Sequence, residues 1–180
     1  MAKLVYPSFD YKESHLDALR EGFTQGVGRQ TPLSEIEKLE DDTIFQNYLN
    51  ALNDQTGEVE CPDGITRPKI SHDLYWLVLD QTFIGSVSFR HELSDLLIHY
   101  GGHIGYGIRP AWKGQGYGKK MVALTLEKAK EQGLDKVLIT CSPDNPASRG
   151  IIEANGGVLE DIRDLSWTTE KIMRFWIDLS

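Results

Sequence analysis

The sequence predicts an α/β fold in which helices flank a central β-sheet, and two observations carry this prediction. Strand-like segments alternate with segments whose apolar residues recur at helical spacing, as Val122, Leu126 and Ala129 do. A run with three closely spaced glycines, Arg109–Lys120, lies where a strand-like segment gives way to a helix-like one. The 180 residues suffice for a full hydrophobic core, so we expect a single domain over 1–180.

The first part of the chain is predicted to be helical. A short helix is expected from Tyr11 to Gly26 or Gly28, where a glycine ends it. Ser34, followed three residues later by Glu37, predicts a capping box at the start of a second helical segment. Residues 53–70 hold two glycines and two prolines and therefore predict a long loop.

Residues 1–70 thus form a helical lead-in, and the core of the domain is expected over 74–179. It opens with a hairpin of two strands, 74–79 and 82–90. The apolar run Val137–Ile139 does not alternate with polar residues, which is typical of a central strand covered on both faces. After the hairpin we expect strand, helix, strand, helix, strand and strand, over residues 103–108, 116–132, 136–141, 145–154, 158–162 and 171–179.

Composition excludes several classes of function. A formal net charge of −8 argues against extended nucleic-acid contact, which needs a basic face. No apolar run approaches the roughly 20 residues of a membrane helix, and the N-terminus lacks the apolar core of a signal peptide. Cys61 and Cys141 give neither a disulfide framework nor metal-ligand spacing. We therefore expect a cytoplasmic protein without nucleic-acid, membrane or metal partners.

The glycine run has the composition of an anion-binding loop. Gly114, Gly116 and Gly118 lie at the junction of strand and helix, where glycine lets the backbone approach a ligand closely. A helix N-terminus offers unpaired N–H groups and the positive end of the helix dipole. Lys113 and Lys119 add positive charge in a chain that is acidic as a whole. The loop is thus predicted to hold the phosphates of a nucleotide-like cofactor.

Other glycine motifs fit this run poorly. A Walker A loop would need glycine at 113 and a hydroxyl residue at 120, and both positions are lysine. A dinucleotide-binding fingerprint would need a third glycine at 119, which is also lysine, and a βαβ unit that the start of the chain does not show. A plain tight turn has no need of three glycines and three lysines.

The segment Lys113–Gly118 resembles the acyl-CoA pyrophosphate loop of the GNAT superfamily of N-acetyltransferases, usually written Gln/Arg-x-x-Gly-x-Gly/Ala. Lys113 departs from the usual Gln or Arg, which keeps the charge but loses the planar fork. Asn145, Ser148 and Gly156 resemble the family's downstream residues at family spacing. The resemblance covers roughly the C-terminal three fifths of the chain and implies a GNAT-like fold with a mixed central sheet.

The resemblance implies acetyl-CoA as co-substrate. Backbone N–H groups of 115–118 would bind the pyrophosphate, and the pantetheine arm would pair with the strand near Tyr106 and Ile108. Backbone N–H groups there could polarise the thioester carbonyl. The implied cofactor-binding residues are Ile108, Lys113, Gly114, Gln115, Gly116, Tyr117, Gly118, Lys119, Asn145 and Ser148.

The resemblance also indicates where a proton donor is expected. The family often places a tyrosine on the last helix, one position before a glutamate or a similar residue, and this chain has Ile152 there. Isoleucine has no proton to donate to the leaving thiolate. Tyr106, Ser148 or water remain as alternative donors, and the sequence does not rank them.

A proton acceptor for the attacking amine is expected from the middle strands. His103 lies near the start of the strand that leads into the glycine loop, close to where relatives carry a base, and an ordinary histidine pKa suits that task. Glu92 and His91, just past the second strand, are the alternatives. The candidate catalytic residues are therefore His103, Tyr106 and Glu92, and no metal ligand is expected.

These features predict an acetyltransferase that moves the acetyl group of acetyl-CoA directly to an amine of a small molecule or a peptide. The substrate is expected between the N-terminal helices, the loop 53–70 and the final strands. The alternative is a non-catalytic acyl-CoA-binding or sensor domain, which the isoleucine at 152 favours. Many relatives are dimers, so a homodimer stays open. Cys141 is expected to be a buried structural residue rather than a nucleophile.

Overall fold

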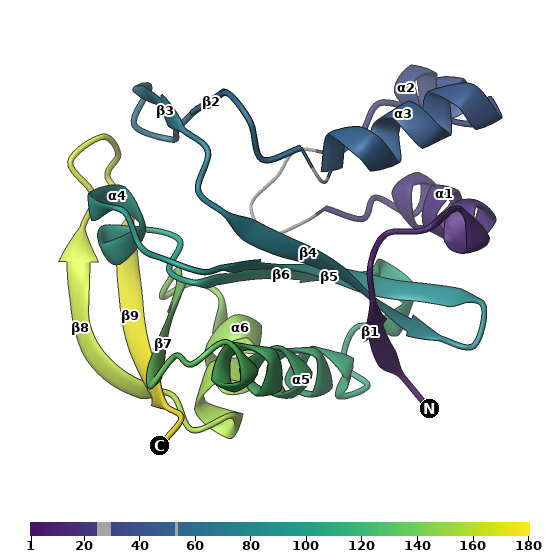
Figure 1. Cartoon of the computed structure of the whole chain (residues 1–180). Coiled ribbons are helices and arrows are strands. Elements are labelled where there is room, and N and C mark those ends of the chain that lie inside the picture. The colour runs from purple at the N-terminus through teal and green to yellow at the C-terminus, as the bar shows by residue number, and fades with distance from the viewer. Residues whose placement is uncertain (25–29, 53) are drawn as a thin grey trace. The chain divides into compact units, whose positions relative to one another are not determined.

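The computed structural model describes residues 1–24, 30–52 and 54–180 (Figure 1). The chain divides into two compact units, and each of them combines segments that are distant in the sequence. The first unit comprises Met1–Asp54, Leu74–Ser88 and Gly105–Thr125; the second comprises Gln55–Asp73, Phe89–Ile104 and Leu126–Ser180. One domain over 1–180 stays a prediction.

The helices and strands alternate along the core, as the sequence predicts. In chain order they are β1 (Lys3–Val5), η1 (Phe9–Tyr11), α1 (Lys12–Arg20), α2 (Leu33–Lys38), α3 (Asp42–Leu52), β2 (Glu58–Glu60), β3 (Thr66–Pro68), β4 (His72–Leu79), β5 (Thr82–Arg90), α4 (Asp95–His99), β6 (Ile104–Ile108), η2 (Pro110–Trp112), α5 (Tyr117–Glu131), β7 (Lys136–Cys141), α6 (Pro146–Ala154), β8 (Val158–Asp164) and β9 (Lys171–Asp178). None of the helices in the described ranges is both long and apolar enough to span a bilayer.

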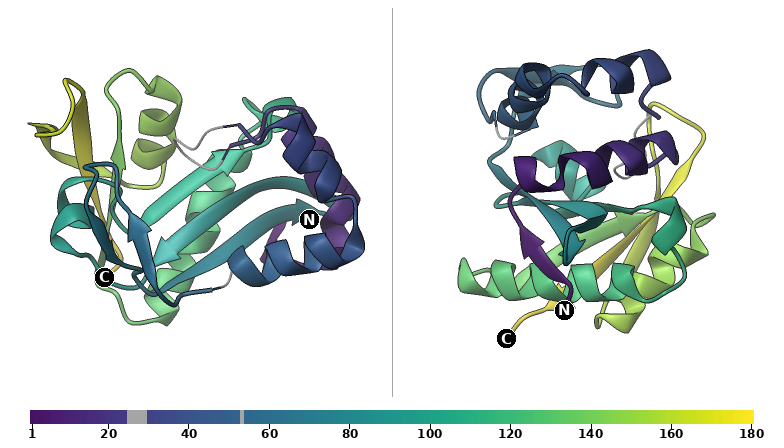
Figure 2. Two further views of the ribbon diagram at one scale, coloured as in Figure 1. Left: turned by 90° about the horizontal axis from the view of Figure 1, so that it is seen from above. Right: turned by 90° about the vertical axis from the view of Figure 1, so that its right-hand side faces the viewer.

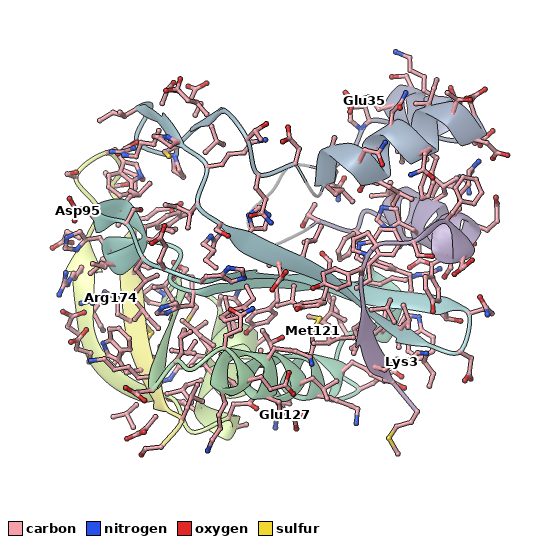
Figure 3. The ribbon with its side chains drawn as sticks, viewed as in Figure 1. Lys3, Glu35, Asp95, Met121, Glu127 and Arg174 are labelled. Atoms are coloured by element: carbon pink, nitrogen blue, oxygen red, sulfur yellow. The ribbon has the colours of Figure 1, made fainter. Side chains whose placement is uncertain are left out.

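The first unit is built on strands of a four-stranded sheet in the order β1-β4-β5-β6. Helices α1, α2 and α3 cover one face, and the start of α5 lies on the other (Figures 1 and 2). Leu16 of α1 and Phe45 of α3 pack in one buried cluster with Trp76 and Phe83 of the sheet. On the opposite face the side chain of Met121 is fully buried (Figure 3). Two cores therefore fix the strands from both sides.

The helical lead-in differs from the prediction in how its helices begin. Ser34 lies inside α2, whose N-cap is Pro32, so the predicted capping box with Glu37 is wrong. A separate helix, α3, follows because the Asp41 carboxylate accepts hydrogen bonds from the backbone N–H groups of Thr43 and Ile44. The first helix, α1, ends at Arg20, and the predicted endpoints Gly26 and Gly28 lie outside the described residues.

The elements of the core follow local sequence signals closely. Hairpin β4–β5 turns at Asp80, whose φ of 53° is tolerated by aspartate. Helix α5 ends before Gly133, which has a φ of 83°. Asn145 caps α6, since its Oδ1 accepts from the Ser148 N–H at 3.0 Å. Short elements were not predicted: β1, α4, and the β2–β3 hairpin that replaces part of the expected 53–70 loop.

The second unit contains the three-stranded antiparallel sheet β7-β9-β8. Strand β7 is buried along most of its length but stands at the end of this strand order, which corrects the predicted central position.

Arg174 of β9 is 2% exposed and bonds the Asp161 carboxylate and the Ile98 carbonyl oxygen (Figure 3). Gly102 forms an isolated bridge with Ile139. This bridge needs glycine, because a Cβ there would lie 2.4 Å from the Leu138 oxygen.

Candidate functional site: a glycine loop at the N-terminus of α5

The glycine loop lies between η2 and the first residue of α5. Gly114 and Gly116 have φ values of 75° and 85°, in the left-handed region that glycine adopts without strain. A Cβ atom at either position would meet no heavy atom within 4 Å, so the space in front of both glycines is open. The 15-residue helix α5 begins directly after Gly116. The loop therefore combines accessible backbone with a helix N-terminus, which suits a phosphate group.

The side chains around the loop hold its shape and add positive charge. The Gln115 side-chain amide donates to the Ala111 carbonyl oxygen at 3.0 Å, which closes the loop on itself. The rings of Trp112 and Tyr117 meet edge to face, with centroids 5.3 Å apart. Lys113 and Lys119 are exposed at the two ends of the loop. Open backbone and flanking lysines fit the pyrophosphate of acyl-CoA.

Strand β6 leads into this loop and is the edge strand of its sheet. An edge strand can accept an added strand, which is how an extended ligand would pair with it. Tyr106 and Ile108 on β6 are half-buried. On its inner side β6 packs closely on β5, because a Cβ at Gly85 would lie 2.3 Å from the Gly107 carbonyl oxygen. Glycine at 85 thus lets β5 approach the predicted acyl-binding strand.

Arg109 anchors the start of the loop to α1, a role that the sequence did not reveal. Its guanidinium bonds both carboxylate oxygens of Glu21, through Nε at 2.9 Å and Nη2 at 2.6 Å. Nη1 donates to the carbonyl oxygen and the hydroxyl of Ser14. The Ser14 hydroxyl also accepts from the Phe83 N–H at 2.9 Å. This network joins α1, β5 and the end of β6.

The charges in this network stabilise each other. The hydrogen bond from Arg109 is the main reason that the pKa of Glu21 lies below its usual range, and the Ala111 N–H adds to it. Glu21 in turn raises the pKa of Arg109. A planar, bidentate guanidinium–carboxylate pair also fixes orientation, which lysine could not do. The loop therefore starts from a rigid point.

His103 has the environment of a structural residue. It is 7% exposed, and its Nδ1 accepts a hydrogen bond from the Leu138 N–H at 2.9 Å. Its backbone N–H and carbonyl are bonded as well, to Leu138 and Arg90. Burial lowers the pKa of His103 to about 4, and the charge of Arg90 adds to this effect. A ring whose Nδ1 is already occupied is a poor proton acceptor, so this geometry disfavours the base predicted from sequence.

Replacement of His103 by asparagine tests the structural role through pH. The folded state lowers the pKa of His103 from 6.5 to about 4. Between these pH values the unfolded chain binds a proton that the folded chain does not, so the free energy of unfolding is highest above pH 6.5 and falls as the pH drops toward 4. His103→Asn keeps an acceptor for the Leu138 N–H but cannot titrate. We expect the free energy of unfolding to depend less steeply on pH in this window, by up to about 1.4 kcal/mol per pH unit. Urea unfolding at several pH values measures it.

The two outcomes of that substitution separate the roles of His103. If His103 is structural, the free energy of unfolding of His103→Asn depends less on pH than that of the wild type, and the pH dependence of kcat/KM is unchanged. If the variant instead lost its activity and the pH dependence of kcat/KM, His103 would be the base after all.

The alternative bases lie just beyond β5, in the second unit. His91 is held on both ring nitrogens, by the Asp73 carboxylate at 3.0 Å and the Ser71 hydroxyl at 3.2 Å. Glu92 is exposed. Their catalytic role stays a prediction, as does that of Tyr106 in the first unit.

The remaining predicted cofactor residues lie on α6 of the second unit. Asn145 and Ser148 form the N-cap of this helix, and their participation in the same site as the glycine loop stays a prediction. Ile152 is fully buried on α6.

Cys141 is buried, and burial raises the pKa of its thiol, which fits a structural residue. Among the described residues there is no group of three or more His, Cys, Asp or Glu that could hold a metal ion.

Comparison with known families agrees with this geometry. Residues 38–158, which are 121 of the 180 residues, match the family described as the acetyltransferase (GNAT) domain. The chain belongs to this family. The resemblance, the fold class and the enzyme class predicted from the sequence are thereby confirmed: the protein is a GNAT acetyltransferase. A search of curated proteins by sequence found no match.

Solved structures of acetyltransferases share the fold over nearly the whole chain. The microcin C7 self-immunity acetyltransferase MccE, in complex with acetyl-CoA and AMP, is 15% identical, with a TM-score of 0.64 over 99% of this chain and 92% of that chain. The spermidine/spermine N-acetyltransferase SpeG from Vibrio cholerae is 16% identical, with a TM-score of 0.58 over 99% and 95%. An acetyltransferase from Salmonella typhimurium that modifies the N-terminal serine of a 50S ribosomal subunit protein is 14% identical, with a TM-score of 0.62 over 99% and 95%.

Proposed function

We propose that this protein transfers the acetyl group of acetyl-CoA directly to an amine of a small molecule or of a peptide. The observation that carries the proposal is the open, left-handed backbone of Gly114 and Gly116 at the start of a long helix, in the segment that follows the edge strand β6. The family match and the acetyl-CoA bound to the related MccE support the same ligand.

The chain offers groups for the pyrophosphate and for the pantetheine arm of acetyl-CoA. Backbone N–H groups from Gln115 to Gly118 bind the pyrophosphate, and Lys113 and Lys119 balance its charge. The outer side of β6, near Tyr106 and Ile108, pairs with the pantetheine arm. Asn145 and Ser148 complete the predicted set from α6. Lys113 acts as a point charge rather than as a bidentate fork.

The transfer needs no covalent enzyme intermediate. The neutral amine attacks the thioester carbonyl, a C–N bond forms and the C–S bond breaks. The proton that the amine loses passes to a basic group or water, and the thiolate of CoA takes up a proton on leaving. Backbone N–H groups on β6 would stabilise the negative charge that develops on the carbonyl oxygen. Tyr106 is our candidate for the proton donor, since Ile152 cannot donate.

The acceptors of two proteins with the same fold indicate the chemical class of the acceptor. SpeG acts on spermidine and spermine, and the Salmonella enzyme modifies an N-terminal serine. Both acceptors present a primary amine. We propose a primary amine for this protein as well, with a homodimer as a possible assembly.

The rival function is an acyl-CoA-binding domain without catalysis, because the usual acid position holds Ile152. Release of free CoA thiol separates the two. The protein is mixed with acetyl-CoA and, one at a time, with tyramine, spermidine and a peptide that begins with serine, and a thiol reagent follows the reaction.

We expect thiol release with at least one amine, and a product heavier by one acetyl group in the mass spectrum. Binding of acetyl-CoA without release for any amine would support the sensor domain. The Gly114→Ala/Gly116→Ala variant, which should bind acetyl-CoA weakly, controls for a contaminating enzyme.

A further inference from the structure

Arg90, the last residue of β5, is a half-buried arginine of the second unit. Its backbone N–H donates to the His103 carbonyl oxygen at 2.8 Å, and its Nη1 donates to the Gly102 carbonyl oxygen at 3.1 Å. These two bonds hold the side chain along the segment that precedes β6. Both acceptors are uncharged, so neither bond balances the charge of the guanidinium.

Arg90 differs in this respect from the other arginines that the structure describes. Each of those forms an ion pair with an Asp or Glu: Arg20, Arg67, Arg109, Arg149, Arg163 and Arg174. Among the described residues no carboxylate pairs with Arg90. A half-buried charge is costly unless it is paired, and this chain has a formal net charge of −8. The unpaired guanidinium therefore indicates an anion that comes from outside the chain.

The remaining N–H donors of Arg90 are accessible to a ligand. A guanidinium has five such donors, and a side-chain hydrogen bond uses only one of them here. In the described part of the chain, no nitrogen of Arg90 is among the polar atoms that are both sealed from solvent and unpaired. Burial lowers the pKa of Arg90 with no acidic neighbour to oppose it, whereas Glu21 raises the pKa of Arg109. The charge is thus partly desolvated and can still be reached from solvent.

The charge of this group favours a carboxylate over a phosphate. A planar guanidinium binds two oxygens of either group through parallel hydrogen bonds. Arg90 supplies one positive charge, and the adjacent His103 is neutral because burial lowers its pKa to about 4. One positive charge balances a carboxylate, whereas a phosphate group carries roughly two negative charges.

We propose that Arg90 binds the carboxylate group of a small ligand. The bonds to Gly102 and His103 fix the arginine, and its remaining N–H donors bond the two carboxylate oxygens. Two sources share this chemistry: the acceptor of the proposed function, if it carries a carboxylate besides its amine, and a separate ligand without an amine. The binding site itself does not depend on acetyl transfer.

Glutarate and glutaramide test the site by thermal unfolding of the full chain. The two compounds have the same length, glutaramide is uncharged, and sodium chloride keeps the ionic strength equal. Calorimetric titration gives the Kd of glutarate. At ten times this Kd, we expect glutarate to raise the Tm of the wild type by about 3–6 °C, and glutaramide to leave it unchanged.

Two variants locate the effect. Arg90→Gln keeps a donor for the Gly102 carbonyl oxygen but removes the charge, so it is expected to abolish the shift in Tm. Arg149→Met is the matched control, since Arg149 pairs with Glu153 at 2.8 Å, and it should keep the shift. No effect of glutarate on the wild type, an equal effect of glutaramide, or an equal effect of glutarate on Arg90→Gln would overturn the proposal.

Thiol release from acetyl-CoA separates the two sources of the carboxylate, and this arm rests on the proposed function. 4-Aminobutyrate carries an amine and a carboxylate, and butylamine carries the amine alone. If the acceptor supplies the carboxylate, kcat/KM should be at least tenfold higher for 4-aminobutyrate in the wild type, and equal for the two amines in Arg90→Gln. The same preference in Arg90→Gln would contradict the role of Arg90.

The remaining outcomes keep the site and the proposed function distinguishable. Equal kcat/KM values in the wild type, together with binding of glutarate that depends on Arg90, would assign the site to a separate ligand. Binding of glutarate that depends on Arg90, without thiol release for any amine, would support the carboxylate site and count against the proposed function.

Discussion

Replacing Gly114 and Gly116 together by alanine is expected to weaken acetyl-CoA binding about 30-fold or more. Both residues have left-handed φ values, which cost an alanine roughly 1–2 kcal/mol each. The substituted loop will relax to avoid this strain and will turn its N–H groups away from the pyrophosphate. Re-forming the binding conformation then costs at least about 2 kcal/mol, which corresponds to this loss of affinity. Isothermal titration with acetyl-CoA measures it.

A glycine in the second unit provides the matched control. Gly64 has a φ of 76°, and a Cβ there also meets no heavy atom within 4 Å. Gly64→Ala introduces the same backbone strain between β2 and β3, so it is expected to reduce stability without changing the affinity for acetyl-CoA. Equal affinity of the wild type and the Gly114→Ala/Gly116→Ala variant would show that the loop does not bind the cofactor.

Replacing Arg109 by methionine is expected to destabilise the fold by about 2–4 kcal/mol. The variant leaves Glu21 without its cation and removes the hydrogen bonds that Arg109 donates to the Ser14 and Phe83 carbonyl oxygens. Methionine fills a similar volume, so the loss reports hydrogen bonds and charge rather than a cavity. Because Arg109 holds α1 against the start of the loop, acetyl-CoA affinity should fall as well. Urea unfolding followed by tryptophan fluorescence gives the change in stability.

Arg149 is a control for the loss of an arginine. It pairs with Glu153 at 2.8 Å on α6, but its side chain is 52% exposed. Exposed pairs of this kind contribute at most a few tenths of a kcal/mol, so Arg149→Met should be nearly neutral. A double-mutant cycle of Arg109→Met with Glu21→Gln should give a coupling of about 1–3 kcal/mol. A coupling near zero would mean that the pair does not anchor α1.

Elements with local signals could be predicted from the sequence. The strands around Asp80, the cap at Asn145 and the end of α5 at Gly133 each depend on a few adjacent residues. The glycine loop is also local, because strand, glycines and helix follow one another in the chain. Family and enzyme class followed from this loop and from the residues at 145 and 148.

Interactions between distant segments could not be predicted. Arg109 bonds Ser14 across 95 positions, and no sequence pattern marks either residue as the partner of the other. His15 reads as one residue of a polar helix, although the fold stacks it on Trp76 with ring centroids 4.5 Å apart. The sequence suggests His103 as a base because it precedes the strand that leads into the glycine loop. Its hydrogen-bond partner, the Leu138 N–H, lies on β7, 35 positions further along the chain, and no local pattern indicates this contact.

Titration of the wild-type protein with acetyl-CoA tests the central claim most directly. We expect saturable binding of one acetyl-CoA per chain, and a clear loss of affinity in the Gly114→Ala/Gly116→Ala variant but not in Gly64→Ala. Absence of binding by the wild type at millimolar acetyl-CoA would contradict the assignment of the glycine loop as the cofactor site.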